Sequence, residues 1–336
     1  MGSTSLELLN QASQSVASSK AAITITKKQK DTGVWAGNLL GLAASSAAGI
    51  KDVGTIPQYR RLLQMGYPRD GRPFKLADRL LFRILSRDAD PGLLFEYQKN
   101  AKASPATAEW LRDYLREAAT AALAEAGYME DPRIRGSAHK IASAISTFLR
   151  SDLAEKPLVK AGKSTILSPD AHPPTWYTLA MVAAMPNLQR ERAGFTERLG
   201  QYLGMPAPKK SFNIPVGKKS LKSDTVLLGC PIVADAKGHA KDIPLALHFI
   251  ELLARIGSVH ASPTATKVLA RMFSECDEHG VWHPHNLRVS PKAGNKLSYH
   301  TYPLQDEAKS TEGRAVDVTF RLALIARLIG LEVETV

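Results

Sequence analysis

The stretch ALHFIELLARIGSVHASPTATKVLARMFSECDEHGVWHP, residues 246–284, contains two helical patterns and two glycine turns. Apolar residues recur at intervals of three and four over 244–256 and again over 263–275, which predicts two amphipathic helices. Gly257 lies where the first helix should end, because glycine readily adopts the left-handed conformation that closes helices. An acidic turn ending in Gly-Val-Trp, residues 280–282, follows the second helix. The stretch therefore predicts one helical hairpin.

Both turns have copies elsewhere in the chain. The sequence Asp-Thr-Gly-Val-Trp occupies residues 31–35, and Gly66-Tyr67 and Gly127-Tyr128 each follow a helical pattern and precede an Arg/Pro turn. The spacing between these last two copies exceeds the roughly 40–47 residues of a HEAT repeat. A helical hairpin cannot bury its apolar face alone, so these copies predict hairpins that stack on their neighbours.

This pattern resembles the repeat of the α/α-toroid families, which include the terpenoid cyclases and the protein prenyltransferases. Leu253 to Gly257 matches their first turn, and Asp277 to Trp282 matches their acidic second turn with one extra residue. RAVDVTFRLALIARLIG (314–330) resembles the next inner helix, and 31–66 resembles the same pattern. The resemblance implies an all-α chain folded as an α/α toroid of about five to six helical hairpins around a central cavity. An open HEAT-like α-solenoid is the alternative.

The remaining elements fit between these hairpins. Amphipathic patterns predict further helices over 76–86, 108–126, 132–149, 175–185, 188–203 and 314–329, the last apolar on almost every face and therefore buried. Alternating Phe212, Ile214 and Val216 predict a small β-hairpin insertion near 209–230. We expect an N-terminal segment over 1–20 that is free to be mobile, and a single toroid domain over 21–336 with a basic insertion at 205–243.

Composition limits the function classes. The chain of 336 residues has a net charge of +12, which favours a polyanionic partner such as nucleic acid. Its two cysteines, Cys230 and Cys276, are expected to be free thiols. No apolar run reaches the roughly 18–20 residues of a membrane span, and the N-terminus lacks a signal-peptide pattern. We therefore expect a cytoplasmic protein without a membrane span.

The acidic turn raises the question of a metal site. Cys276, Asp277, His279, His283 and His285 supply enough donors for zinc, although their spacing suits no standard zinc motif. Protein prenyltransferases hold zinc with an adjacent Asp and Cys, but at the opening of a helix rather than after its end. The alternative is a structural turn in which Asp277 bonds locally and Trp282 packs between hairpins. We favour the turn and predict no cofactor.

Motifs for defined reactions are absent from the sequence. It lacks the Asp-x-Asp-Asp acid of protonating cyclases, magnesium-binding aspartate runs, a P-loop, GxGxxG and GxSxG. Only 7% of the residues are aromatic, too few for the ring-lined cavity that stabilises carbocations. The sequence therefore names no reaction and does not decide whether the chain is an enzyme.

Polar residues on otherwise apolar helices are the candidates for a site in the cavity, because burying them is unfavourable unless something binds them. Asp317 and His248 are the candidate catalytic residues. The candidate ligand-binding residues are Asp242, Glu251, Arg314, Arg321, Trp176 and Tyr177. Several have a structural alternative: Asp317 with Arg321 as an ion pair, His248 as a core histidine, Asp242 as a helix cap and Trp176 as a packed residue.

Two functions follow from these features. The first is a divergent or degenerate terpenoid cyclase- or prenyltransferase-like protein that binds a small or lipid-like ligand, phosphorylated or not, in the central cavity. The second is a non-enzymatic basic helical-repeat module that binds nucleic acid or a protein. Its basic surface would consist of Lys209, Lys210, Lys218, Lys219 and Lys222.

Overall fold

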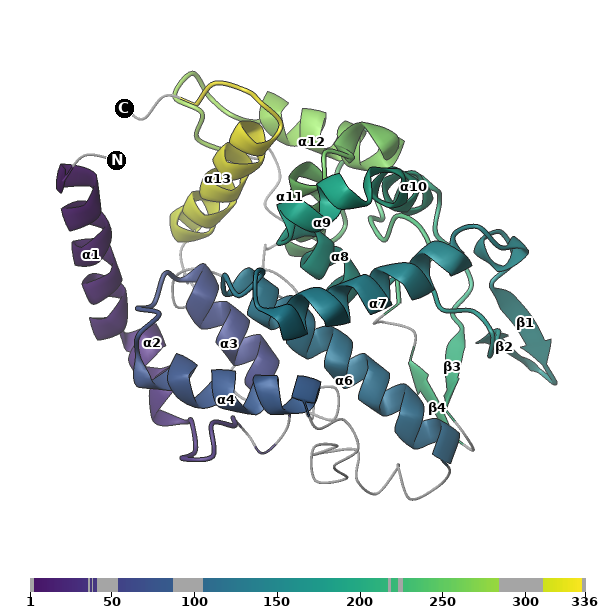
Figure 1. Cartoon of the computed structure of the whole chain (residues 1–336). Helices are drawn as coiled ribbons and strands as arrows, with labels where there is room; N and C mark the ends of the chain where they lie inside the picture. Colours follow the sequence, from purple (N-terminus) through teal and green to yellow (C-terminus); the bar gives the residue numbers. More distant parts are fainter. Residues whose placement is uncertain are drawn as a thin grey trace. The chain divides into compact units, whose positions relative to one another are not determined.

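The computed structural model describes residues 3–35, 37, 39–40, 54–86, 105–216, 219–222, 226–283 and 311–333. As predicted, the described chain is mostly helical with a small inserted sheet (Figure 1). It divides into two compact units, the first ending at Ser137 and the second beginning at Ala138. The single toroid domain over 21–336 and its basic insertion at 205–243 stay predictions. No helix of the described residues is long and apolar enough to span a membrane.

The first unit is built from helices of which three pack on one another. α3, α4 and α6 form this core, and the bounds of the helices are α1 (Ser3–Ser18), α2 (Lys20–Lys27), α3 (Thr55–Gln64), α4 (Arg72–Ser86) and α6 (Pro105–Glu125). α7 (Pro132–Phe148) continues into the second unit. α3 is buried on every side from Thr55 to Leu62, as expected for the inner helix of stacked hairpins. Helix α1 lies within residues 1–20, the N-terminal segment that we expected to be free to be mobile.

The second unit is organised around α11 (Ile243–Arg255). This helix packs against α8 (Trp176–Ala183), α12 (Pro263–Ser274) and α13 (Thr311–Leu328). The outer helices are α9 (Pro186–Glu191) and α10 (Ala193–Gly204), with two short 3-10 helices, η3 (Asp152–Ala154) and η5 (Val259–Ala261). α10 packs on η5 and α12. The structure has two helices, α9 and α10, where the sequence predicted one over 188–203. They are separated at Arg192, whose backbone dihedral angles are not helical.

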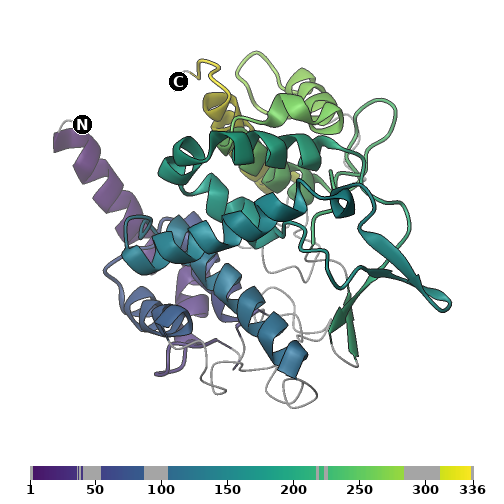
Figure 2. The same cartoon turned by 45° about the vertical axis from the view of Figure 1, so that its right-hand side comes forward.

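The inserted sheet has four strands in the order β1-β2-β3-β4 (Figure 2). β3 (Asn213–Val216) and β4 (Lys219–Lys222) are antiparallel, which confirms the predicted hairpin. A second hairpin, β1 (Leu158–Ala161) with β2 (Ser164–Leu167), was not predicted and joins the first through the parallel pair β2–β3.

The part of the chain that the structure describes contains four copies of the glycine turn that was predicted to close helices. The glycine N–H donates to the carbonyl three residues earlier, and the next N–H donates to the carbonyl five residues earlier, at 2.8–3.2 Å. This is a Schellman motif, and its glycine adopts a positive φ that other residues avoid. The four glycines are Gly66, Gly127, Gly257 and Gly330, which follow α3, α6, α11 and α13.

Among the described residues the acidic turn occurs in three copies, of which the sequence revealed two. In each, the glycine N–H donates to the carbonyl three residues earlier, and the N–H of that earlier residue donates to the carbonyl after the glycine, at 2.9–3.1 Å. The copies are Lys30–Val34, Asp277–Val281 and Asp235–His239. The third copy was missed because Ala240 stands where the others have tryptophan.

The structure of α13 differs from the expectation that its apolar sequence would be buried on almost every face. Val318, Leu322 and Ile325 are buried, but Val316 and Phe320 are 54% and 53% exposed. The prediction of burial on nearly every face was therefore wrong for this helix. Apolar composition alone did not distinguish the side that packs on α11 from the opposite side.

Candidate functional site

Charged side chains from α11 and α13 form a cluster within the second unit. Arg255 donates from Nε and Nη2 to Glu251 Oε1 at 3.0 and 2.9 Å. Arg321 Nη1 lies 3.9 Å from Glu251 Oε2, and its Nε lies 3.6 Å from Asp317 Oδ1. Arg321 is only 5% exposed. Burial lowers the pKa of the Arg321 guanidinium, while the two carboxylates act in the opposite direction. The structure thus joins three of the predicted residues in one network.

An aromatic stack lies on the same helix, one turn before Glu251. The His248 ring stacks on Trp176 of α8, with 5.5 Å between ring centroids and 20° between planes. Phe249 meets the same indole edge to face. His248, Trp176 and Tyr177 are all buried, so these rings belong to the interior of the unit.

The other predicted ligand-binding residues do not join this network. Asp242 caps α11, because its Oδ1 accepts the Leu245 N–H at 3.0 Å. The structural alternative for Asp242 is therefore confirmed. Arg314 belongs to α13, but its side chain lies outside the described residues.

The acidic turn at 276–283 has a structural explanation. Asp277 Oδ1 accepts the N–H groups of His279 and Val281 at 2.9 Å each, and its Oδ2 lies 2.9 Å from His283 Nε2. Cys276 donates its thiol to the Met272 carbonyl at 3.5 Å. Burial, Asp277 and Glu275 raise the pKa of that thiol, in that order of effect. The local bonding predicted for Asp277 is confirmed.

The zinc interpretation gains no support from these contacts. In the part of the chain that the structure describes, no group of three or more His, Cys, Asp or Glu side chains is arranged to hold a metal ion. His285 lies outside the described residues. Cys230 is a free, buried cysteine, and Cys276 is also a free thiol, as expected.

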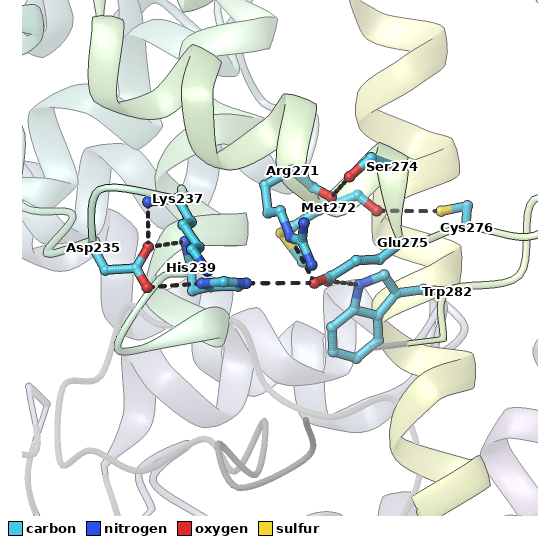
Figure 3. Close-up of polar contacts among 9 residues, drawn as sticks. All are labelled: Asp235, Lys237, His239, Arg271, Met272, Ser274, Glu275, Cys276 and Trp282. Atoms are coloured by element: carbon cyan, nitrogen blue, oxygen red, sulfur yellow. Dashed lines mark hydrogen bonds and ion pairs between the residues drawn. The ribbon is translucent and has the colours of Figure 1, made fainter. Parts of the chain in front are cut away.

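Glu275, just before this turn, is the centre of a polar cluster that sequence reasoning missed (Figure 3). Its side chain is 7% exposed. Arg271 Nε and Trp282 Nε1 donate to its two oxygens at 2.9 and 3.0 Å. His239 Nε2 lies 4.0 Å from Glu275 Oε1, and Asp235 Oδ2 lies 2.7 Å from His239 Nδ1.

The outer end of this cluster faces solvent. Hydrogen bonds from the His239 ring and from backbone N–H groups lower the pKa of Asp235 to about 2. The carboxylate therefore stays charged and holds the ring in place through Nδ1. The hydrogen bond from Trp282 to Glu275 also joins the acidic turn to the end of α12. We therefore assign this cluster a structural role.

A second cluster that the sequence did not reveal lies in the first unit, around Asp78 of α4. Its two oxygens accept hydrogen bonds from Tyr59 Oη at 2.5 Å and Tyr128 Oη at 2.7 Å. Arg69 Nη2 lies 3.5 Å from Asp78 Oδ2, and its guanidinium lies over the Phe74 ring, 4.3 Å from the centroid. These contacts join the Gly66 and Gly127 turns, because Arg69 and Tyr128 follow those glycines.

Ionisation of Tyr59 should require unfolding. Burial, and then the charge of Asp78, raise the Tyr59 pKa far above its ordinary value, so the neutral phenol is the folded form. Stability is therefore present below the unfolded pKa of roughly 10 and is lost as the pH rises beyond it. Tyrosinate absorbance of native protein at about pH 11 should be the same for the wild type and Tyr59→Phe. In denaturant the variant should show one tyrosinate fewer. A lower native signal in the variant would contradict the assignment.

The predicted basic residues flank or belong to the β3–β4 hairpin. Lys209 and Lys210 are exposed just before β3, and Lys219 and Lys222 are the ends of β4. Lys218 lies outside the described residues. The paired hairpin adds Lys160 in β1 and Lys163 in its turn, both exposed, which the sequence analysis missed.

Comparisons of the chain with protein-family models, with curated proteins and with solved structures find no match.

Proposed function

We propose that the hairpins of this chain are repeats of an α/α toroid, in which the polar side chains of the inner helices bind a small ligand. The recurrence of two turn types supports the fold. Schellman glycines follow α3, α6, α11 and α13, and acidic-type turns precede the helices α3, α11 and α13. A toroid alternates these turns at opposite ends of its hairpins. An open solenoid stays the alternative architecture.

The cluster of Glu251, Asp317 and Arg321 carries the ligand proposal. Replacing a buried ion pair by well-packed apolar residues is often neutral or stabilising, so packing alone gives little reason to keep these charges on inner helices. Arg321 is nearly fully buried, and its guanidinium lies 3.6 Å from Asp317 and 3.9 Å from Glu251. A guanidinium has five N–H donors, so a ligand oxygen at this position would be recognised by hydrogen bonding.

The chemistry of the cluster defines the ligand class. Carboxylates accept hydrogen bonds from hydroxyl groups, and guanidinium groups donate to hydroxyl, carboxylate or phosphate oxygens. The stacked rings of Trp176 and His248 are buried one helical turn from Glu251, so the interior beside the cluster is largely apolar on that side. We infer a small or lipid-like molecule with an oxygen-rich end, of which a phosphate is one form. If the ligand is turned over, Asp317 and His248 are the groups able to move a proton.

Native mass spectrometry of the freshly purified protein, set against the denatured mass, tests this proposal. We expect a co-purified organic ligand in the wild type and its loss from Asp317→Asn and His248→Ala. A hydrogen bond to a charged group contributes about 1.5–3 kcal/mol, so affinity should fall roughly tenfold to a hundredfold. Circular dichroism would establish that both variants are folded.

Matched controls are available on the acidic turn. Glu278→Gln and His279→Ala change the same kinds of side chain where they are exposed, at 86% and 72%, and should leave the ligand bound. A clean apo mass for the wild type, or full retention of the ligand in both cluster variants, would overturn the proposal.

A further inference from the structure

The two hairpins of the sheet come from chain segments that contain lysine but no acidic residue. Residues 156–169 contain Lys156, Lys160 and Lys163 with no Asp or Glu. Residues 205–223 contain five lysines, again with no Asp or Glu. Elsewhere basic residues alternate with acids, as the ion pairs of α6 and α11 show. Neither segment contains arginine.

Strand pairing brings these two segments together. Ile166 of β2 pairs with Asn213 of β3, so the hairpins form one continuous sheet although more than 40 residues separate them in the chain. Figures 1 and 2 show the β1–β2 hairpin reaching beyond the helices of its unit. A Gly-Lys pair at 162–163 joins β1 to β2, and the same pair recurs in the sequence at 217–218.

The lysines whose side chains the structure describes face solvent without acidic partners. Lys156, Lys160, Lys163, Lys209 and Lys210 are all exposed. None of these five forms an ion pair with a carboxylate of the described residues. Their charges give the two segments a positive potential, although the exposed Glu155 and Asp170 border the first segment.

We propose that this basic sheet, defined as residues 156–169, 205–216 and 219–222, binds the phosphate backbone of nucleic acid without sequence preference. Lysine contacts phosphate as a point charge, whereas bidentate recognition of a base edge usually requires arginine, asparagine or glutamine. A surface with lysine and no arginine therefore suits the backbone rather than the bases. This proposal concerns a different region from the inner-helix cluster and does not depend on the small ligand.

A lipid surface suits the sheet less well. Stable attachment to a membrane needs a second signal besides basic charge, such as an amphipathic apolar face. Among the described residues of the basic sheet, the large apolar side chains that are well exposed are Val159 and Met205, at 40% and 43%. These are single residues in separate segments, so charge is the main feature that the surface offers.

Fluorescence anisotropy of the full chain with a labelled single-stranded oligonucleotide and a duplex, over a series of salt concentrations, tests the proposal. Binding should be independent of sequence and should weaken steeply with salt. If about five lysines contact phosphates, the slope of log K against log salt should be roughly −3.5 for a single strand and −4.5 for a duplex. Replacing Lys156, Lys160 and Lys163 by Glu should reduce the slope by about 2 to 3.

A control with the same charge change separates the sheet from overall charge. Lys237→Glu, Lys241→Glu and Lys267→Glu alter exposed lysines of the same unit outside the sheet, and this triple variant should keep most of the affinity. Equal weakening by both triple variants would overturn the assignment to the sheet. Failure to bind at low salt, or tighter binding to anionic phosphatidylserine vesicles than to either oligonucleotide, would overturn nucleic acid as the partner.

Discussion

Gly204→Ala is expected to destabilise the second unit by roughly 2–4 kcal/mol, because overpacking against backbone atoms cannot be relieved by a rotamer change. Gly204 ends α10, where that helix packs on η5. A Cβ at this position would overlap the carbonyl group of Ala261 and approach the Ser262 nitrogen. The helix would have to move away from η5. Thermal and denaturant unfolding, followed by circular dichroism, would measure the loss.

The same helix offers a matched control for this substitution. Gly194 is exposed, has ordinary helical backbone, and its added Cβ would meet only the mobile end of Arg198 at 3.5 Å. Alanine in a helix is favoured over glycine by up to about 1 kcal/mol, so Gly194→Ala should be neutral or stabilising. Similar stability for Gly204→Ala and the wild type would contradict the close contact between Gly204 of α10 and Ala261 of η5.

Arg60→Met is expected to cost about 3–5 kcal/mol, because it leaves a largely buried carboxylate without its partner. Arg60 in α3 donates from Nε and Nη2 to the two oxygens of Glu125 in α6, at 2.5 and 2.7 Å. The Arg60 side chain is 2% exposed and that of Glu125 is 22% exposed. This bidentate pair connects two hairpins, so its loss should also loosen their packing.

A double-variant cycle identifies the origin of that effect. Arg60→Met combined with Glu125→Met removes both charges and should recover part of the stability, because no carboxylate is then left unpaired. Arg72→Met is the exposed comparison: its pair with Asp31 is mostly in solvent, so the change should cost about 0–1 kcal/mol. Additive single effects in the cycle would mean that the Arg60–Glu125 contact contributes nothing of its own.

Local features of the fold were predictable, and features that join distant segments were not. Helix ends and the Gly66, Gly127 and Gly257 turns follow from periodicity and glycine position, which a short window of sequence contains. The β1–β2 hairpin was missed because four residues carry little strand signal and its pairing partner β3 lies far along the chain. The acidic-type turn at Asp235 was missed because it shares the backbone hydrogen bonds of the other two turns but lacks their tryptophan.

The same distinction holds for the candidate site. Asp317 with Arg321 and Glu251 with Arg255 are helix neighbours four residues apart, so their pairing could be expected. Contact between Glu251 and Arg321 depends on how α11 and α13 pack, which no local pattern encodes. The sequence did not predict the Glu275 cluster, because its residues come from two turns and a helix that are brought together only by the fold.

The two turns that end in tryptophan also bind to the helices that follow them in the chain. The backbone N–H of Trp35 donates to Thr55 Oγ1 at 3.1 Å, and that of Trp282 donates to Thr319 Oγ1 at 3.0 Å. Each bond fixes the start and the finish of an intervening segment beside one another. The Trp35 turn is thereby joined to α3, and the Trp282 turn to α13. A substitution that removes either threonine hydroxyl should therefore loosen both a turn and the first or middle part of the helix that follows it.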